Sequence, residues 1–143
     1  MAVNGRAKGA AGEREFADWL QRVLRLEIKP QRNLEQVRSG GADIVDVPPF
    51  LFEVKRCEQL SLRSWWLQVK TASESHLDSV PVVAYRQNRQ PWRFLISANF
   101  IGVGKGFVQL EELEFKQWAD LILNWYTNRS EDLDTQLTKT VSD

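Results

Sequence analysis

The stretches GGADIV at residues 40–45 and FLFEVK at residues 50–55 give the first indication of the fold of this 143-residue chain. Asp43 opens one short apolar segment, and Glu53 and Lys55 end the next. Because side chains alternate across a strand, Glu53 and Lys55 share one face, and Phe50, Phe52 and Val54 take the other. Burying a carboxylate and an ammonium on such a strand is costly, so these charges are expected to serve a purpose.

Asp43 and Glu53 are the kind of ligands that Mg²⁺ takes in proteins, where one or two carboxylates are completed by water and phosphate. The pair therefore predicts a divalent-cation site. Lys55 would stand beside it, to orient a water molecule or to stabilise charge on a phosphate. Asp46 competes with Asp43, but it lies just before a Pro-Pro pair, where an aspartate commonly begins a turn. Asp43 follows a glycine pair that permits a tight bend or a close approach to a ligand, and we prefer it.

Residues 8–25 predict an amphipathic helix. At about 100° per residue its apolar side chains fall on one arc, comprising Phe16, Ala17, Leu20, Val23 and Leu24. Glu13 lies near the middle of that arc, whereas Glu15 lies on the opposite, solvated side with Asp18 and Arg22. A glutamate on an apolar face must be ion-paired, neutral or close to a metal. A buried salt bridge and a frayed first turn therefore stay open beside the metal role.

Together these residues resemble the PD-(D/E)XK nuclease superfamily. The opening KGAAGERE at residues 8–15 is similar to the first helix of Holliday junction resolvases and related phage nucleases. In those proteins a site glutamate follows the glycine of a Lys-Gly pair by four residues, which here is Glu13. The family's Asp maps onto Asp43, and its Glu-x-Lys maps onto Glu53 and Lys55. The resemblance implies an α/β fold with a restriction-endonuclease-like core, in which a mixed central β-sheet is flanked by α-helices.

The resemblance also implies hydrolysis of a DNA phosphodiester with Mg²⁺, for which Mn²⁺ should substitute. Asp43 and Glu53 would hold one or two ions, and the main-chain carbonyl of Val54 would add a ligand. Glu13 would bind a second ion or a metal-bound water. Lys55 would position or deprotonate the attacking water.

Gln68 is a further candidate, since relatives often carry a Gln or Lys on the helix after the Glu-x-Lys strand that reaches the metal-bound water or the phosphate. It lies beside the expected buried side of a helix over residues 62–75, so plain surface or packing polarity is the alternative. Trp65 and Trp66 on the same helix could stack on unpaired bases. Tryptophans at helical spacing are more often core, and we expect at least one of them there.

Composition excludes several classes of protein. With one cysteine, Cys57, and one histidine, His76, the chain lacks an intramolecular disulfide framework, a Cys/His zinc site and a Ser-His-Asp triad. No segment approaches the roughly 18 apolar residues of a membrane helix, and no signal peptide precedes the first helix. We expect an intracellular, cytoplasmic protein, and the family likeness suggests that it is phage-encoded.

The net charge is zero, but the charges are unevenly distributed. Residues 1–40 carry eight basic and five acidic side chains, residues 41–105 carry eight and six, and residues 106–143 carry three and eight. The first two parts can form a phosphate-binding face. Arginines near the expected strand ends are candidates for phosphate contacts, namely Arg56, Arg63, Arg86, Arg89 and Arg93.

The patterning predicts one domain over residues 1–126, which the resemblance implies is a nuclease domain, followed by a mobile acidic tail over residues 127–143. Strands at about 43–47 and 50–55 should form an antiparallel pair. Further strands are expected at 80–85, 92–96 and 107–110, and a last helix at 111–126.

The residues and the resemblance together predict a metal-dependent DNA endonuclease that is selective for branched DNA, like a Holliday junction resolvase in recombination or repair. We expect a homodimer, with Trp92 or Trp118 as exposed candidates for an apolar interface. A nuclease acting on nicked, flapped or single-stranded DNA is one alternative. A DNA- or protein-binding module that kept the fold without catalysis is another, and the complete set of acids with Lys55 argues against it.

Overall fold

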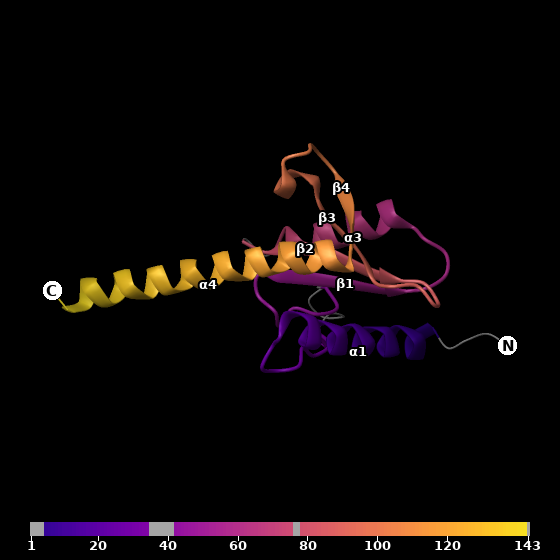
Figure 1. Ribbon diagram of the computed structural model, residues 1–143, viewed down its shortest axis with the longest axis horizontal. Helices are drawn as coiled ribbons and strands as arrows, with labels where there is room; N and C mark the ends of the chain where they lie inside the picture. The colour runs from indigo at the N-terminus through magenta and orange to yellow at the C-terminus, as the bar shows by residue number, and fades with distance from the viewer. Residues whose placement is uncertain (1–4, 35–41, 76–77, 143) are drawn as a thin grey trace.

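The computed structural model describes residues 5–34, 42–75 and 78–142 (Figure 1). In chain order the elements are α1 (Gly5–Leu24), β1 (Phe50–Arg56), α3 (Leu62–Ser73), β2 (Val80–Arg86), β3 (Arg93–Ser97), the 3-10 helix η1 (Ala98–Ile101), β4 (Phe107–Glu111) and α4 (Glu112–Ser142). The glycine pair at residues 40–41 and His76 lie outside the described residues.

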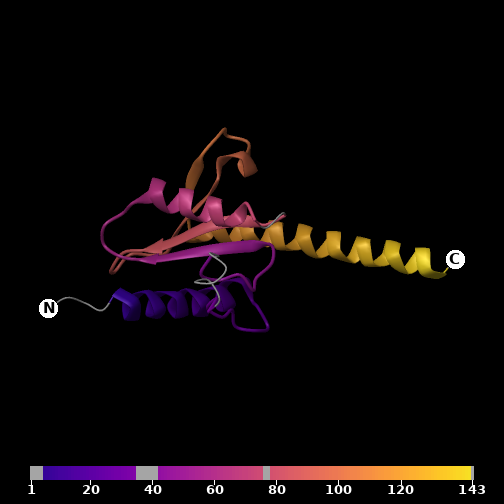
Figure 2. The ribbon, with the colours of Figure 1, turned by 180° about the vertical axis from the view of Figure 1, so that it is seen from behind.

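The described strands form a mixed sheet in the order β1-β2-β3-β4. β1 and β2 are parallel, and the remaining neighbours are antiparallel. The parallel pair needs a crossover connection, which α3 supplies. Figures 1 and 2 show α1 and α3 on opposite sides of the sheet. The predicted class, a mixed sheet flanked by helices, is confirmed.

The alternation predicted for β1 divides the core into two parts. Phe50, Phe52 and Val54 face α1 and the first half of α4, where the rings of Phe94 and Phe115 stack 3.9 Å apart. The other face packs against α3. On that side of the sheet Glu53 pairs in register with Val83, and Lys55 with Tyr85. Both charged residues therefore lie on the α3 side, as their spacing predicts.

The predicted strand at residues 43–47 is wrong, although its predicted antiparallel direction relative to β1 is kept in a single bridge. Only Ile44 bridges to β1, opposite Phe52. The backbone then turns away into Pro48 and Pro49, which have no N–H to continue a ladder. Beside the bridge, the side chain of Asp43 replaces a main-chain partner of β1. Its Oδ2 accepts a hydrogen bond from the Val54 N–H (2.7 Å).

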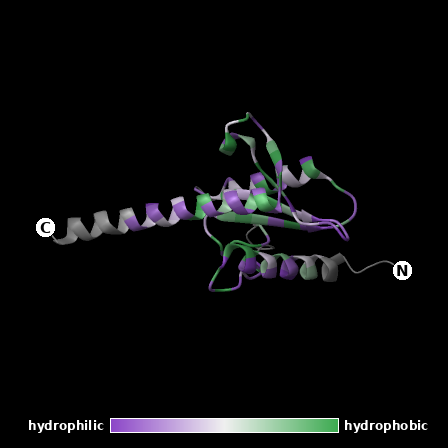
Figure 3. Ribbon diagram, viewed as in Figure 1, coloured by the Kyte–Doolittle hydropathy of each residue, from purple (hydrophilic) through white to green (hydrophobic). Residues whose placement is uncertain are grey.

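Helix α4 does not end at Tyr126 but continues to Ser142, so the predicted end of the last helix is wrong. From Glu112 to Ser142 the sequence contains no glycine or proline that would stop a helix. Figure 3 shows hydrophobic residues along β1 and hydrophilic residues where α4 leaves the sheet. Among the described residues, no helix is both long and apolar enough to cross a bilayer.

Trp92 was expected as an exposed candidate for an apolar interface, and this is wrong, since only 3% of Trp92 is exposed. Its ring lies 4.9 Å from that of Phe16 in the core. Trp118 is half-buried and packs against the same cluster, with its ring 5.7 Å from that of Phe50. The aromatic residues of this chain are used largely to fill the interior.

Candidate active site

Asp43 is fixed against the outer edge of β1, which is an edge strand of the described sheet. Its main-chain N–H donates to the Phe52 carbonyl (2.8 Å), and its side chain accepts from the Val54 N–H. Asp43 is 4% exposed. Two hydrogen bonds to one strand hold this carboxylate in a defined place beside β1.

The carbonyl of Val54 lies at the same edge. In a strand the N–H and C=O of one residue point to the same side, and the N–H of Val54 points toward Asp43. The carbonyl oxygen therefore faces the edge that carries the Asp43 carboxylate, where it is a second hard oxygen donor.

Glu53 is buried, and the Nζ of Lys55 lies 3.4 Å from its Oε1. Burial and then the charge of Asp43 raise the pKa of Glu53 to about 7, against the opposing effect of Lys55. Glu53 is thus poised between its protonated and ionised forms near neutral pH. A cation placed beside it would favour the ionised form.

Glu13 is 8% exposed and lies on the inward side of α1, as its helical phase predicts. The Nε of Arg32 donates a hydrogen bond to its Oε2. The salt bridge that was left open for this residue is therefore present. The pKa of Glu13 is nevertheless raised, first by burial and further by the carboxylate of Asp43, against the opposing effect of Arg32.

Asp43 raises the pKa of both Glu13 and Glu53, so carboxylates from α1, from the segment beside β1 and from β1 itself lie close together. In the described residues no three acidic, histidine or cysteine side chains form a ready ligand group. Mg²⁺ commonly needs only one or two protein carboxylates, completed by water and phosphate. Asp43, Glu53 and the Val54 carbonyl fit that requirement.

The structure also bears on the competing candidates. Asp46 is exposed, and its Oδ2 accepts a hydrogen bond from the Gln31 N–H (3.0 Å), which supports the preference for Asp43. Gln68 is exposed and lines a hollow on α3 with Ser64, Leu67 and Thr71. It is not among the groups that shift the pKa of Glu53.

Trp65 and Trp66 are both buried, in the part of the core that includes Tyr85, so the expectation that at least one of them is core is confirmed. The ring of Trp65 lies 5.6 Å from that of Tyr85. The pair anchors α3 on the sheet.

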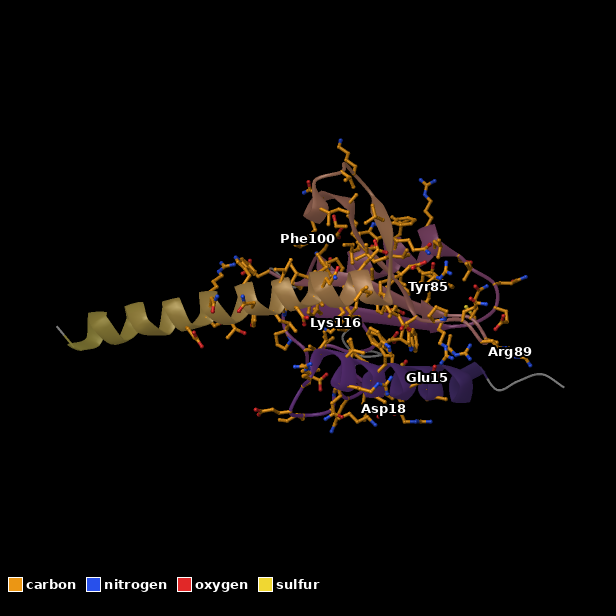
Figure 4. All side chains as sticks on the ribbon, viewed as in Figure 1. Glu15, Asp18, Tyr85, Arg89, Phe100 and Lys116 are labelled. Carbon is orange, nitrogen blue, oxygen red and sulfur yellow. The ribbon has the colours of Figure 1, made fainter. Side chains whose placement is uncertain are left out.

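Two functional candidates were missed from the sequence. Arg32 follows the first helix in a stretch without clear periodicity, and no pattern links it to Glu13. Glu15 was expected to be solvated, and this is wrong, because it forms ion pairs with Arg56 and Arg86. Its partners come from the ends of β1 and β2, and helical phase alone does not reveal them. Figure 4 shows Glu15 and Asp18 on α1, with Arg89 at the turn between β2 and β3.

A family model described as phage putative PDDEXK endonuclease matches residues 4–116. The chain belongs to this family. The match runs from α1 into the start of α4 and contains Glu13, Asp43, Glu53 and Lys55. Membership of the PD-(D/E)XK superfamily, predicted from those residues, is confirmed.

One similar solved structure is that of Hjc, a Holliday junction resolvase from the archaeal hyperthermophile Archaeoglobus fulgidus. The identity is 22% and the TM-score 0.45, over 73% of this chain and 84% of that one. No curated protein is similar enough in sequence to count as a match.

Proposed function

We propose that this member of the phage PD-(D/E)XK endonuclease family hydrolyses phosphodiester bonds of branched DNA with Mg²⁺, for which Mn²⁺ substitutes. The observation that carries the proposal is the pair of buried carboxylates, Asp43 and Glu53, gathered at the edge of β1 with Lys55 beside them. Asp43 raises the pKa of Glu53, and two buried acids this close would be poorly suited to a site without a cation.

When bound, the ion supplies Lewis-acid charge neutralisation at the phosphate and lowers the pKa of its water. Asp43, Glu53 and the Val54 carbonyl would hold it. Lys55, whose Nζ lies 3.4 Å from Glu53, orients a water molecule or a phosphate oxygen next to the ion. Glu13 would contribute a further carboxylate, for a second ion or a metal-bound water, and Arg32 favours its ionised form.

The preference for branched DNA rests on the resemblance of the first helix to that of the resolvases, and nicked, flapped or single-stranded DNA are the alternative substrates. Arg63 and Arg89 are exposed and are the better candidates for phosphate contacts. Arg56 and Arg86 are engaged with Glu15.

The test is a cleavage assay on four-way junctions, flaps and linear duplex with Mg²⁺, Mn²⁺, Ca²⁺ or EDTA. Asp43→Asn and Glu53→Gln should abolish cleavage, because each removes a charged ligand, while DNA binding in Ca²⁺ persists. Asp46→Asn is the matched control and should cleave normally. Wild-type cleavage in EDTA would contradict the metal mechanism. Binding without cleavage of any DNA would favour the non-catalytic alternative.

A further inference from the structure

We propose that Glu15 is a positioning residue of the acidic centre, which fixes α1 on the ends of β1 and β2 and thereby places Glu13 against Asp43. The inference rests on the proposed function, since it assigns Glu15 a task in the same site. Glu15 does not touch the reacting atoms and acts through Glu13.

The ion pairs of Glu15 reach two strands at once. Its Oε1 contacts Nη1 of Arg86, and its Oε2 lies 3.7 Å from Nε of Arg56. Both arginines are themselves anchored to main-chain carbonyls. Arg56 Nη1 donates to the Arg86 carbonyl (3.4 Å), and Arg86 Nε donates to the Gln90 carbonyl (2.6 Å). Glu15 therefore binds cations whose positions are already fixed on the sheet.

A second contact locates α1 on the same arginine. A Cβ placed on Gly12 would lie only 2.7 Å from Cβ of Arg56, so the helix backbone rests directly on the end of β1. Glu13 lies between Gly12 and Glu15, within less than one helical turn. The two contacts flank Glu13 and limit both the sliding and the rotation of α1 at that point.

The expected effect is on geometry more than on stability. Glu15 is about one-third exposed, with 37% of its side chain accessible, and ion pairs of this kind add little to folding. Displacing a functional group by about 1 Å, however, can cost on the order of 100-fold in rate. Loss of Glu15 should therefore weaken the function of Glu13 while leaving the fold intact.

The first experiment compares Glu15→Gln with Asp18→Asn, which removes the same charge from the exposed side of the same helix. Glu15→Gln should lower cleavage about tenfold and raise the Mg²⁺ concentration needed for half-maximal rate. Asp18→Asn should change neither. A loss of rate in Glu15→Gln without a change in its Mg²⁺ dependence would reduce the residue to a structural role and overturn the proposal.

The second experiment places Glu15→Gln in the Glu13→Gln background. If Glu15 acts through Glu13, the double variant cleaves no more slowly than Glu13→Gln alone. Losses that multiply would overturn the proposal.

A titration of DNA-free protein with Mn²⁺ provides a readout that does not depend on cleavage. Glu15→Gln and Glu13→Gln should weaken binding by similar factors, and unchanged Mn²⁺ affinity in Glu15→Gln would count against the positioning role. A wild type that binds Mn²⁺ but cuts no DNA would refute the proposed function alone, because the titration still tests the role of Glu15.

Discussion

The carboxylate of Glu53 lowers the stability of the metal-free protein, because its ionised form is buried next to Asp43. Its pKa in the folded protein, about 7, lies above the ordinary value of 4.5, chiefly because of burial and then because of Asp43. Between those two pH values the unfolded chain has released the proton that the folded protein keeps. Stability without metal should therefore fall as the pH rises from about 4.5 to 7 and then level off.

This pH dependence predicts that Glu53→Gln stabilises the metal-free protein at pH 8, by roughly 3 kcal/mol at most, while it abolishes cleavage. The gain should be much smaller at pH 5, where Glu53 already holds its proton. Denaturant unfolding in EDTA at both pH values measures this. The exposed Glu27→Gln is a control that should show neither effect, and an equal loss of stability at both pH values would contradict the assignment.

Lys55 should act on water or phosphate more than on the ion. Lys55→Ala should therefore lose most turnover but retain Mn²⁺ binding in calorimetry. Because Lys55 also lowers the pKa of Glu53, metal binding by this variant should move to higher pH.

Lys55→Arg separates these two effects. It should restore the pH dependence but little of the turnover, since a planar guanidinium does not occupy the position of an ammonium. Strong recovery of turnover would show that Lys55 provides only a positive charge.

The packing of α1 on β1 depends on the absence of a side chain at Gly12. Gly12→Ala would place its Cβ 2.7 Å from Cβ of Arg56, and a Cβ cannot move as the tip of a flexible side chain can. Although alanine favours helix by about 1 kcal/mol over glycine, this variant should be destabilised by about 1–3 kcal/mol and should lose activity.

Gly9→Ala is the matched control, because nothing lies within 4 Å of the Cβ it would add. It should be neutral or slightly stabilising in denaturant unfolding. Equal stability of the two variants would mean that α1 does not rest on β1 as described.

The assembled protein is expected to be a homodimer that prefers four-way junctions to linear duplex of equal length. A four-way junction presents two phosphates related by near two-fold symmetry, which a two-fold dimer with one site per subunit can cut in one encounter. The prediction does not depend on Trp92, which is buried.

Sedimentation and competition binding in Ca²⁺ test the dimer and the junction preference separately, at a salt concentration where non-specific binding has faded. A monomer with equal affinity for duplex and junction would favour the flap or single-strand alternative. The chemistry assigned to Glu13, Asp43, Glu53 and Lys55 would be unaffected.

Features that depend on local periodicity can be predicted from the amino-acid sequence of this chain. Alternation along residues 50–55 predicts which side chains of β1 enter the core and which share a face with Glu53. Helical phase places Glu13 inward, and the ordered set of acids with Lys55 leads to the family. These inferences hold because the spacing of side chains along a strand or helix is fixed by the backbone alone.

Which residues meet across the fold becomes visible in the packing of the helices on the sheet. The hydrogen bond from Val54 to Asp43, the pairing of Arg32 with Glu13 and the contact of Arg86 with Glu15 join residues 11, 19 and 71 positions apart. The periodicity of the sequence does not predict contacts at such separations, because they depend on how α1 packs against the sheet. For the same reason Glu15 was predicted to be solvated, although packing against two strands gives it two partners.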